Sequence, residues 1–162
     1  MLTLKRMIWT GLLAMVPIVE VKGAIPFGQA VGLHPVLSYI AAIVGSSIML
    51  TFLAYFTRWF YAECKRRGFF KRFTGWMDKI ANKNLPKWKK FGHWAIVAYV
   101  AVPIPGTGTW TGAIIASVLG MTPKKIIFSV FCGNLISGLL MSFFSKGILN
   151  IAIIENLINS LK

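Results

Sequence analysis

Apolar positions dominate four long stretches of this 162-residue chain, and none of the four contains a charged side chain. The stretches are Met7–Val19, Gly23–Thr57, Phe91–Pro123 and Ile126–Ser145. About 18 uncharged apolar residues are enough to cross a bilayer as a helix. Charged residues make up 14% of the chain, against roughly 25% in a soluble domain. The pattern therefore predicts an all-α integral membrane protein.

The positions of proline and glycine indicate that the chain is built from two related halves. A constant offset of 88 residues relates Pro17, Gly32, Pro35 and Gly45 to Pro105, Gly120, Pro123 and Gly133. A fixed offset is the signature of internal duplication, and each half contains a broken apolar segment followed by an uninterrupted span. The predicted bounds are 1–57 and 91–145 for the halves, 7–35 and 91–123 for the broken segments, and 36–57 and 126–145 for the spans.

The broken segments are too long and too interrupted to be single helices. At ~1.5 Å per residue, Gly23–Thr57 would extend for about 52 Å, against a hydrocarbon core of ~30 Å. The expected interruptions are Pro26, Gly28, Gly32 and Pro35 in the first half, and Pro103, Pro105, Gly106, Gly108 and Gly112 in the second. Re-entrant hairpins would make the halves an inverted repeat, whereas fully crossing segments would make them parallel. The paired breaks favour re-entrant hairpins, since irregular backbone survives at membrane depth only inside protein or beside a wet cavity.

Basic residues gather in the segment between the two halves. Of the 18 Lys and Arg that give a formal net charge of +14, eleven lie in Arg58–Lys90. Retention of basic loops in the cytoplasm produces this distribution, so we expect a multi-pass plasma-membrane protein with a cytoplasmic connector at 58–90 and no nucleic-acid partner. Apolar residues at helical spacing predict an amphipathic helix in the connector, lying on an anionic leaflet of membrane lipids: Phe69, Phe70, Phe73, Trp76, Met77 and Ile80. A similar pattern predicts a C-terminal interfacial helix over 147–161.

No set of residues in the sequence suggests covalent catalysis or a cofactor. Cys64 and Cys132 lie in different environments and imply neither a disulfide framework nor a metal site. The four acidic residues include no pair close enough in sequence to suggest general acid–base work. We expect that the protein is not an enzyme and uses no metal or cofactor.

Glu20 is the only acidic residue inside an apolar stretch, three residues after Pro17. A carboxylate at membrane depth is costly, so by default it marks a functional site. We predict that Glu20 binds and releases a proton during transport, with Lys22 as its counter-charge. Residues i and i+2 face apart on a regular helix, so this pairing requires irregular backbone. If both residues lie at the membrane interface instead, they only mark the end of a loop.

The turn-rich segment 102–112 is the second candidate site. Its candidate substrate-binding residues are Pro105, Gly106, Thr107, Gly108 and Thr109. Hydroxyls and free backbone amides at the start of a half-helix suit an anion such as a phosphate. Pro26, Gly28 and Asn134 are assigned to the same substrate cavity. A position in the middle of a span also suits Asn134 to hydrogen bonding between helices.

Two motifs resemble those of a known family. Glu20-Val-Lys-Gly-Ala-Ile-Pro-Phe-Gly28 and Val102-Pro-Ile-Pro-Gly-Thr-Gly-Thr-Trp-Thr-Gly-Ala113 are similar to segments of the small multidrug export proteins, distant relatives of the DedA/VTT (SNARE-associated) superfamily. The resemblance covers nearly the whole chain. It implies two oppositely oriented re-entrant hairpins, each followed by a membrane helix. In the DedA branch it also implies proton-linked translocation of lipid phosphates, including undecaprenyl phosphate.

The resemblance assigns roles to particular residues of this chain. Glu20 matches the acidic position ahead of the first hairpin, Pro105 and Gly106 match the Pro-Gly of the second, and Asn134 matches a polar position in the following helix. DedA proteins carry arginines around the second Pro-Gly, but this chain has none between Lys90 and Lys124. Phosphate binding would therefore depend on backbone amides and on Thr107, Thr109 and Lys22.

Three functions remain open from the sequence. The leading hypothesis is a proton-coupled transporter of a lipid phosphate or similar amphiphilic anion. An exporter of hydrophobic cationic drugs is the second, and it requires Lys22 to point away from Glu20. A non-transporting membrane scaffold or assembly factor is the third, and it requires a dry interior with no cavity that reaches either hairpin. Small-x3-small pairs such as Gly28–Gly32 are also compatible with a homodimer.

Overall fold

Helices form every regular element in the described part of the computed structural model, which comprises residues 1–68, 75, 92–104 and 107–160. Side chains are described as far as Gly147, apart from Tyr61, Lys65 and Lys146. The helices are α1 (Leu2–Met15), α2 (Glu20–Ala30), α3 (Pro35–Arg67), the short helix Gly92–Ala101, α5 (Thr109–Val118) and α6 (Pro123–Ser160).

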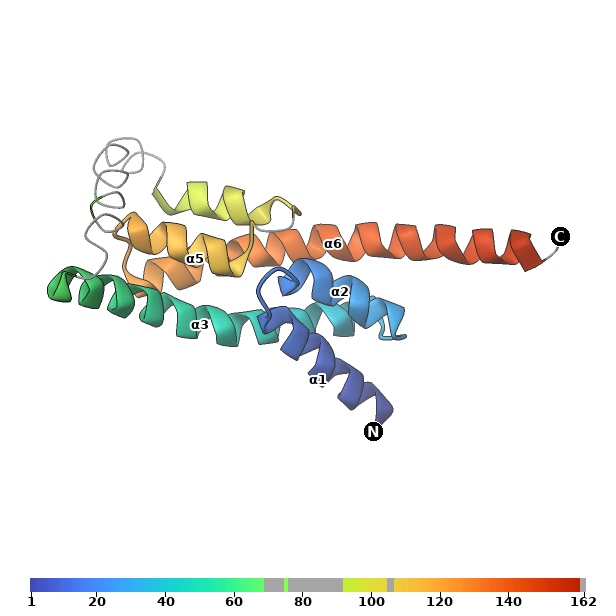
Figure 1. The fold of residues 1–162 in the computed structure, drawn as a ribbon. Helices are drawn as coiled ribbons and strands as arrows, with labels where there is room; N and C mark the ends of the chain where they lie inside the picture. Colours follow the sequence, from blue (N-terminus) through green and yellow to red (C-terminus); the bar gives the residue numbers. More distant parts are fainter. Residues whose placement is uncertain (69–74, 76–91, 105–106, 161–162) are drawn as a thin grey trace.

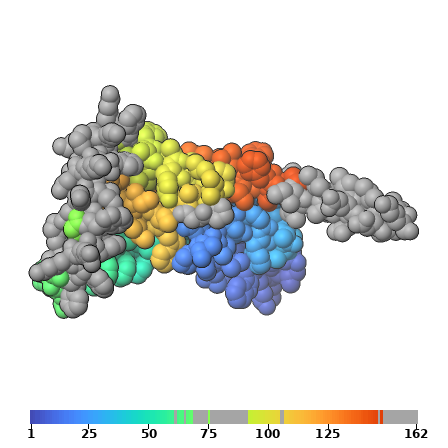
Figure 2. All heavy atoms as spheres, turned by 45° about the horizontal axis from the view of Figure 1, so that its top comes forward, coloured from blue at the N-terminus to red at the C-terminus, as the bar shows by residue number. Residues whose placement is uncertain are grey.

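Two helical hairpins approach each other from opposite ends of the molecule (Figure 1). The first consists of α1 and α2, and the second consists of Gly92–Ala101 and α5. Their turns meet near the middle of the molecule, while α3 and α6 run alongside in opposite directions (Figure 1). Two hydrogen bonds show that the long helices are antiparallel. Tyr39 Oη, near the start of α3, donates to the Leu135 carbonyl, and Arg58 Nη1, near its end, donates to the Met121 carbonyl. In Figure 2 the first hairpin (blue) lies against the second half (yellow to orange).

The turns that lead into the two long helices are the same in both halves. The Gly32 N–H bonds to the Gln29 carbonyl and the Leu33 N–H bonds to the Gly28 carbonyl, which together form a Schellman motif at the end of α2. At the end of α5 the same two bonds join Gly120 to Ser117 and Met121 to Ala116, each displaced by 88 positions. Both glycines have a positive φ, +85° for Gly32 and +74° for Gly120, which explains why glycine occupies both positions.

Side-chain hydrogen bonds between the halves follow the same offset. Ser145 Oγ on α6 donates to Gln29 Oε1 on α2 at 2.6 Å. The position equivalent to Ser145 in the first half is Thr57, and the position equivalent to Gln29 in the second half is Ser117. The hydroxyls of Thr57 and Ser117 lie 2.6 Å apart. Each hairpin is therefore attached to the long helix of the other half by an equivalent pair of side chains.

Glycines also set the packing of each long helix against the first helix of its own hairpin. A Cβ built on Gly45 in α3 would overlap the Gly11 carbonyl of α1. A Cβ on Gly133, the equivalent position in α6, would lie 2.6 Å from the Val100 Cβ and 3.0 Å from the Val97 carbonyl. The Gly45–Gly133 match in the sequence thus corresponds to two close helix crossings of the kind that small residues permit.

Large apolar side chains cover the outside of the molecule, and a number of polar side chains are buried inside it beside two apolar clusters. Large apolar side chains cover the outside of α3 and α6, with Ile48 at 58%, Phe52 at 56% and Phe143 at 76% exposure. Buried polar residues include Thr10, Glu20, Lys22, Gln29, Ser38, Thr109, Asn134, Ser137 and Ser145. The segments Pro35–Cys64 and Pro123–Ser145 are long and apolar enough to cross a membrane, each with a mean hydropathy of 2.0. An apolar exterior of this extent is typical of a surface that does not face water.

The helices differ in their bounds from the elements that the sequence predicts. The first hairpin begins at Leu2 rather than at residue 7, and α3 continues to Arg67 instead of ending at 57. Residues 147–160 continue α6 without a break, so this part of the chain is not a separate interfacial helix. The predicted ends were placed at basic residues, but Lys and Arg are good helix formers and end an apolar stretch without ending a helix. Most of the connector, including the predicted amphipathic helix, lies outside the described residues.

The predicted breaks at Pro26, Gly28 and Gly112 do not interrupt the helices. α2 runs through both Pro26 and Gly28, and α5 runs through Gly112. The chain leaves the helical path at 31–34, 102–104 and 107–108, which contain the predicted breaks Gly32, Pro103 and Gly108, and also at 16–19 and 119–122. A proline inside a helix removes one hydrogen bond, and the packing of α2 against α1, α3 and α6 offsets that loss.

Candidate functional site

The turn between α1 and α2 is strained, and it delivers two charged residues to the centre of the molecule. Pro17 excludes the helical conformation at Val16, whose φ of −73° and ψ of 132° are extended. Ile18 and Glu20 then adopt positive φ angles of 79° and 48°, which are unusual for residues with a Cβ. Such strain persists only where the surroundings hold it, and it concentrates at functional sites. As a result α2 begins directly at Glu20, with Lys22 in its first turn.

The carboxylate of Glu20 occupies the N-terminus of α5. Its side chain is buried, with 3% of the residue exposed, and Oε1 accepts a hydrogen bond of 3.1 Å from the backbone N–H of Trp110. A Cβ built on Gly108, the N-cap residue of α5, would overlap Oε2 of Glu20. A helix N-terminus carries unpaired N–H groups and a partial positive charge, so it stabilises an anion at this place. The site that the sequence predicts for an anionic ligand is therefore filled by the protein's own carboxylate.

Lys22 binds the second hairpin rather than Glu20. Its Nζ donates to the Ile104 carbonyl at 2.9 Å, to the Thr107 carbonyl at 3.0 Å and to Thr107 Oγ1 at 2.6 Å. These three bonds use the three N–H donors of the ammonium group. Between Glu20 and Lys22, both of which the structure describes, no direct ion pair forms. The predicted pairing is thus replaced by two separate attachments to one loop, because the residues face apart at the start of α2.

Trp110 completes the contact between the hairpins from the other side. Its indole Nε1–H donates to the Met15 carbonyl at the end of α1, at 3.1 Å. The backbone N–H of the same residue holds Glu20. We call the set Glu20, Lys22, Ile104, Thr107 and Trp110 the hairpin junction. It is a polar cluster, with the Glu20 and Lys22 side chains buried, in which each hairpin supplies donors to carbonyl oxygens of the other.

Asn134 supports the junction from α6. Its Nδ2 donates to Thr109 Oγ1 at 2.8 Å, and both side chains are buried. Thr109 is the first residue of α5, so this bond ties the start of that helix to α6. Asn134 thereby fixes the N-terminus that Glu20 occupies, which agrees with its predicted role in hydrogen bonding between helices.

The other predicted substrate residues lie elsewhere or outside the described part. Gly28 is buried beside Ser38 and Thr10, whose Oγ atoms lie 2.7 and 2.9 Å from a Cβ built on it. It therefore serves the packing of α2 against α1 and α3 and does not line the junction. Pro26 is half-buried within α2, two turns from Glu20. Pro105 and Gly106 lie outside the described residues.

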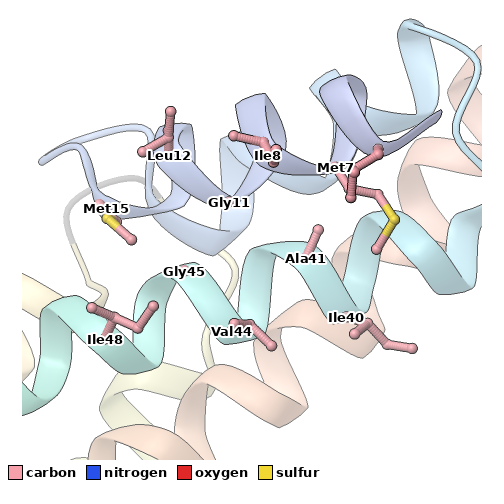
Figure 3. Close-up of a pocket in the computed structure, with 11 residues that line it drawn as sticks. Met7, Ile8, Gly11, Leu12, Met15, Ile40, Ala41, Val44, Gly45 and Ile48 are labelled. Carbon is pink, nitrogen blue, oxygen red and sulfur yellow. The ribbon is translucent and has the colours of Figure 1, made fainter. Parts of the chain in front are cut away.

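An apolar groove runs between α1 and α3 (Figure 3). It has a volume of about 360 Å³ and begins beside the junction at Met15, whose carbonyl accepts the Trp110 indole N–H. Leu12, Ile40, Val44 and Ile48 contribute aliphatic side chains to its walls. No charged residue lines it, so it offers surface only to an apolar group. In the part of the chain with described side chains, no group of three His, Cys, Asp or Glu residues is placed to hold a metal ion.

The residues of the hairpin junction all fall within a region that matches a known family. Residues 20–140 match the family described as "Putative small multi-drug export protein", and the match covers about three quarters of the chain. The chain belongs to the small multi-drug export protein family. Neither curated proteins nor solved structures gave a match. The match extends from Glu20 to Leu140 and so includes Lys22, the segment 102–112 and Asn134.

The structure of this small multi-drug export protein also gives a role to residues that the sequence left unassigned. From the sequence alone, Trp110 is typical of a residue at the membrane interface, and nothing in the sequence indicates a role for Met15. The offset of 88 indicates a role for Trp110, because it aligns Glu20 with Gly108 and Lys22 with Trp110. Both of the equivalent positions in the second half lie at Glu20, since Gly108 packs against its carboxylate and the Trp110 N–H bonds to it.

Proposed function

We propose that this small multi-drug export protein crosses the membrane as an inverted repeat, with two re-entrant hairpins that enter from opposite faces and with α3 and α6 as the crossing helices. The opposite directions of α3 and α6 support this proposal, as do the equivalent bonds Gln29–Ser145 and Thr57–Ser117. The apolar exterior supplies the lipid-facing surface. In this orientation the basic connector 58–90 lies in the cytoplasm of a plasma-membrane protein.

The proposed function is proton-coupled membrane export, with the hairpin junction as its centre. The observation that carries it is the buried carboxylate of Glu20 on the N-terminus of α5, between the two hairpins. The junction is neutral while Glu20 is ionised and Lys22 is charged. Uptake of one proton by Glu20 removes its negative charge, weakens its bond to the α5 N-terminus and leaves Lys22 uncompensated. The contact between the hairpins then loosens, which couples protonation to opening of the centre.

An amphiphilic anion such as a lipid phosphate is the substrate class that fits the protonated junction. With Glu20 neutral, the Trp110 N–H loses its anionic acceptor, and the charge of Lys22, which stays bonded to Ile104 and Thr107, is left without a nearby negative charge. An anionic head group would restore the charge balance there. The apolar groove that begins at Met15 lies beside this place and accommodates the hydrophobic part of the same molecule.

Export of a hydrophobic cation is the second candidate, and one contact supports it. Lys22 is held by Ile104 and Thr107 and forms no ion pair with Glu20. Once displaced from α5, the carboxylate is therefore free to bind a cation, and protons and cations would exchange at Glu20. The name of the family is in keeping with this candidate.

The decisive experiment measures proton-linked transport by the full chain in proteoliposomes. Glu20→Gln keeps an oxygen that accepts from the Trp110 N–H but takes up no proton, so we expect folded protein without proton-linked transport. Glu63→Gln is the matched control, since Glu63 is a carboxylate bound to Arg66 and Arg67 on the exposed part of α3. Unchanged transport by Glu20→Gln would rule out the coupling role. No transport by the native protein under any gradient would instead favour the scaffold hypothesis.

A competition assay separates the two substrate classes. Binding of a fluorescent amphiphile is measured on the same preparation with a lipid phosphate and with a quaternary amine as competitors. Displacement by the lipid phosphate that becomes stronger as the pH falls supports the anion. Displacement by the quaternary amine, strongest at high pH, supports the cation.

A further inference from the structure

Four buried polar groups without a hydrogen-bond partner lie on one side of the hairpin junction. They are Gln29 Nε2, Ser38 Oγ, Ser137 Oγ and Ser142 Oγ. Gln29, Ser38 and Ser137 are at least nine-tenths buried as whole residues, with 8%, 0% and 0% exposure. Buried donors and acceptors are almost always paired, with protein or with water, so each such group in a native structure needs an explanation.

Contacts along α6 show that these groups form a series leading away from the junction. Asn134 lies at the junction through its bond to Thr109, and Ser145 lies at the other end through its bond to Gln29. Ser137 and Ser142 fall between them, over a rise of about 16 Å from 134 to 145. On α3, Ser38 Oγ lies 2.7 Å from a Cβ built on Gly28, the residue before Gln29 in α2, while the adjacent Tyr39 packs on Gly138 of α6. The series therefore runs between α2, α3 and α6, from Asn134 to the end of the molecule that carries the α2 C-terminus.

The equivalent positions on the opposite side of the junction are apolar or paired. The offset of 88 relates Ser38, Ser137 and Ser142 to Ile126, Met49 and Ala54. Ile126 and Ala54 are fully buried in a hydrophobic cluster, and Met49 packs against it. Gln29 corresponds to Ser117, whose hydroxyl is bonded to Thr57. The two sides share a backbone arrangement but differ in polarity, since four unpaired groups lie on this side and, among the described side chains, Ser129 Oγ alone is unpaired on the other.

We propose that Gln29, Ser38, Ser137 and Ser142 line a route by which water carries protons to Glu20 from the end of the molecule that holds the Gln29–Ser145 bond. Water molecules need two to four polar partners to occupy a buried site, and a row of unpaired donors and acceptors supplies them. The opposite side, with Ile126, Met49 and Ala54, stays dry. The route deepens the proposed function, since it rests on Glu20 as the proton acceptor and assigns the side from which the proton arrives. In the proposed orientation this side faces away from the cytoplasm.

Cysteine accessibility in the reconstituted full chain tests the route. The native Cys64 and Cys132 are first replaced by serine, and Ser38→Cys and Ser137→Cys are exposed to a small charged methanethiosulfonate. Met49→Cys and Ile126→Cys are the controls at equivalent positions. Ser129→Cys is a further control, because Ser129 Oγ is equally buried and unpaired but lies beside Val130 in the hydrophobic cluster. We expect modification of Ser38→Cys and Ser137→Cys at least tenfold faster than that of the three controls.

The results distinguish the route from the proposed function. Equal modification rates at all five positions, or none at Ser38→Cys and Ser137→Cys, would overturn the route and would mean that these hydroxyls bond to carbonyls of their own helices. Fast modification together with full transport by Glu20→Gln would leave the hydrated route standing and overturn the coupling role. A second measurement uses Ser137→Ala, for which we expect proton-linked transport several-fold slower than with Ser129→Ala. Equal rates for the two alanine variants would count against the route even if the cysteine variants fail to fold.

Discussion

Glu20 and Gly108 occupy equivalent positions in the two halves of the chain and lie against each other in the structure. They are 88 residues apart, the offset that relates the two hairpins, and a Cβ on Gly108 would overlap the Glu20 carboxylate. If both positions carried a side chain, the two would compete for one place. The two halves are therefore asymmetric at this contact, with the carboxylate on one hairpin and glycine on the other.

The same asymmetry extends to the next equivalent pair. Lys22 and Trp110 both donate an N–H to a carbonyl of the other hairpin, Lys22 to Ile104 in the turn after Gly92–Ala101 and Trp110 to Met15 at the end of α1. One donor is charged and the other is neutral. The first hairpin thus supplies the ionisable groups, and the second supplies the backbone amide, hydroxyl and indole that hold them.

Gly108→Ala is predicted to displace the Glu20 carboxylate. The added methyl group overlaps Oε2, and crowding of this kind in a packed site costs about 1–3 kcal/mol. We expect a lower melting temperature in detergent and loss of proton-linked transport. Gly147→Ala is the control, since a Cβ at Gly147 meets nothing within 4 Å.

The double variant Gly108→Ala with Glu20→Gly tests whether the overlap is the cause. Glycine at position 20 removes the carboxylate and also suits the positive φ of 48° there. We therefore expect the double variant to recover the stability that Gly108→Ala loses, without recovering transport. If the stability losses of the two single variants simply add up in the double variant, residues 20 and 108 do not interact.

Gly45→Ala and Gly133→Ala are predicted to separate each long helix from the first helix of its own half. The methyl group at position 45 meets the Gly11 carbonyl, which cannot rotate away, and the one at 133 meets Val100. We expect a loss of about 1–3 kcal/mol for each, larger for Gly45→Ala because backbone yields less than a side chain. Thermal unfolding in detergent, with Gly147→Ala alongside, measures both. Melting temperatures equal to that of Gly147→Ala would contradict the close crossings.

The sequence predicts much of this arrangement because proline and glycine act locally. Gly32 and Gly120 are required by positive φ angles, and Pro35 is the first residue of α3, after the cap formed by His34 Nδ1 on the Val36 N–H. These signals act within a few residues, so they can be recognised without knowledge of the tertiary fold. Glu20 can also be recognised from its immediate neighbours, because a carboxylate among apolar residues is costly to bury and therefore indicates a functional site.

The contacts of the site could not be predicted in the same way. Whether the α5 N-terminus binds a ligand or Glu20 depends on how the two hairpins meet, which no local pattern records. Pro26 breaks a helix by its own preference, yet tertiary packing keeps α2 continuous through it. The basic residues after Thr57 predict the end of the span at 57, but the apolar helix continues past this point to Arg67, because Lys and Arg do not end a helix.

Asn134→Ala and Thr109→Val are predicted to be coupled. Their side chains share a buried hydrogen bond of 2.8 Å that holds the start of α5 against α6. Bonds of this kind between membrane helices contribute about 0.6–2 kcal/mol. We expect the double variant to lose less stability than the sum of the single losses by that amount, as measured by unfolding in mixed micelles. Strict additivity would indicate that Asn134 stabilises α6 through other groups.

His34→Cys and Thr122→Cys are predicted to react with a membrane-impermeant maleimide from opposite sides of the membrane. The two positions are equivalent, directly precede Pro35 and Pro123, and are both exposed. In an inverted repeat the starts of α3 and α6 lie on opposite faces, whereas in a parallel repeat they lie on the same face. Both variants are made without Cys64 and Cys132, and sealed vesicles of known orientation are labelled before and after permeabilisation. Labelling of both from one side would exclude the inverted arrangement, and the central junction could not then be reached alternately from the two faces. Labelling from opposite sides, with Thr122→Cys on the cytoplasmic side, is the result that the positions of the basic residues predict.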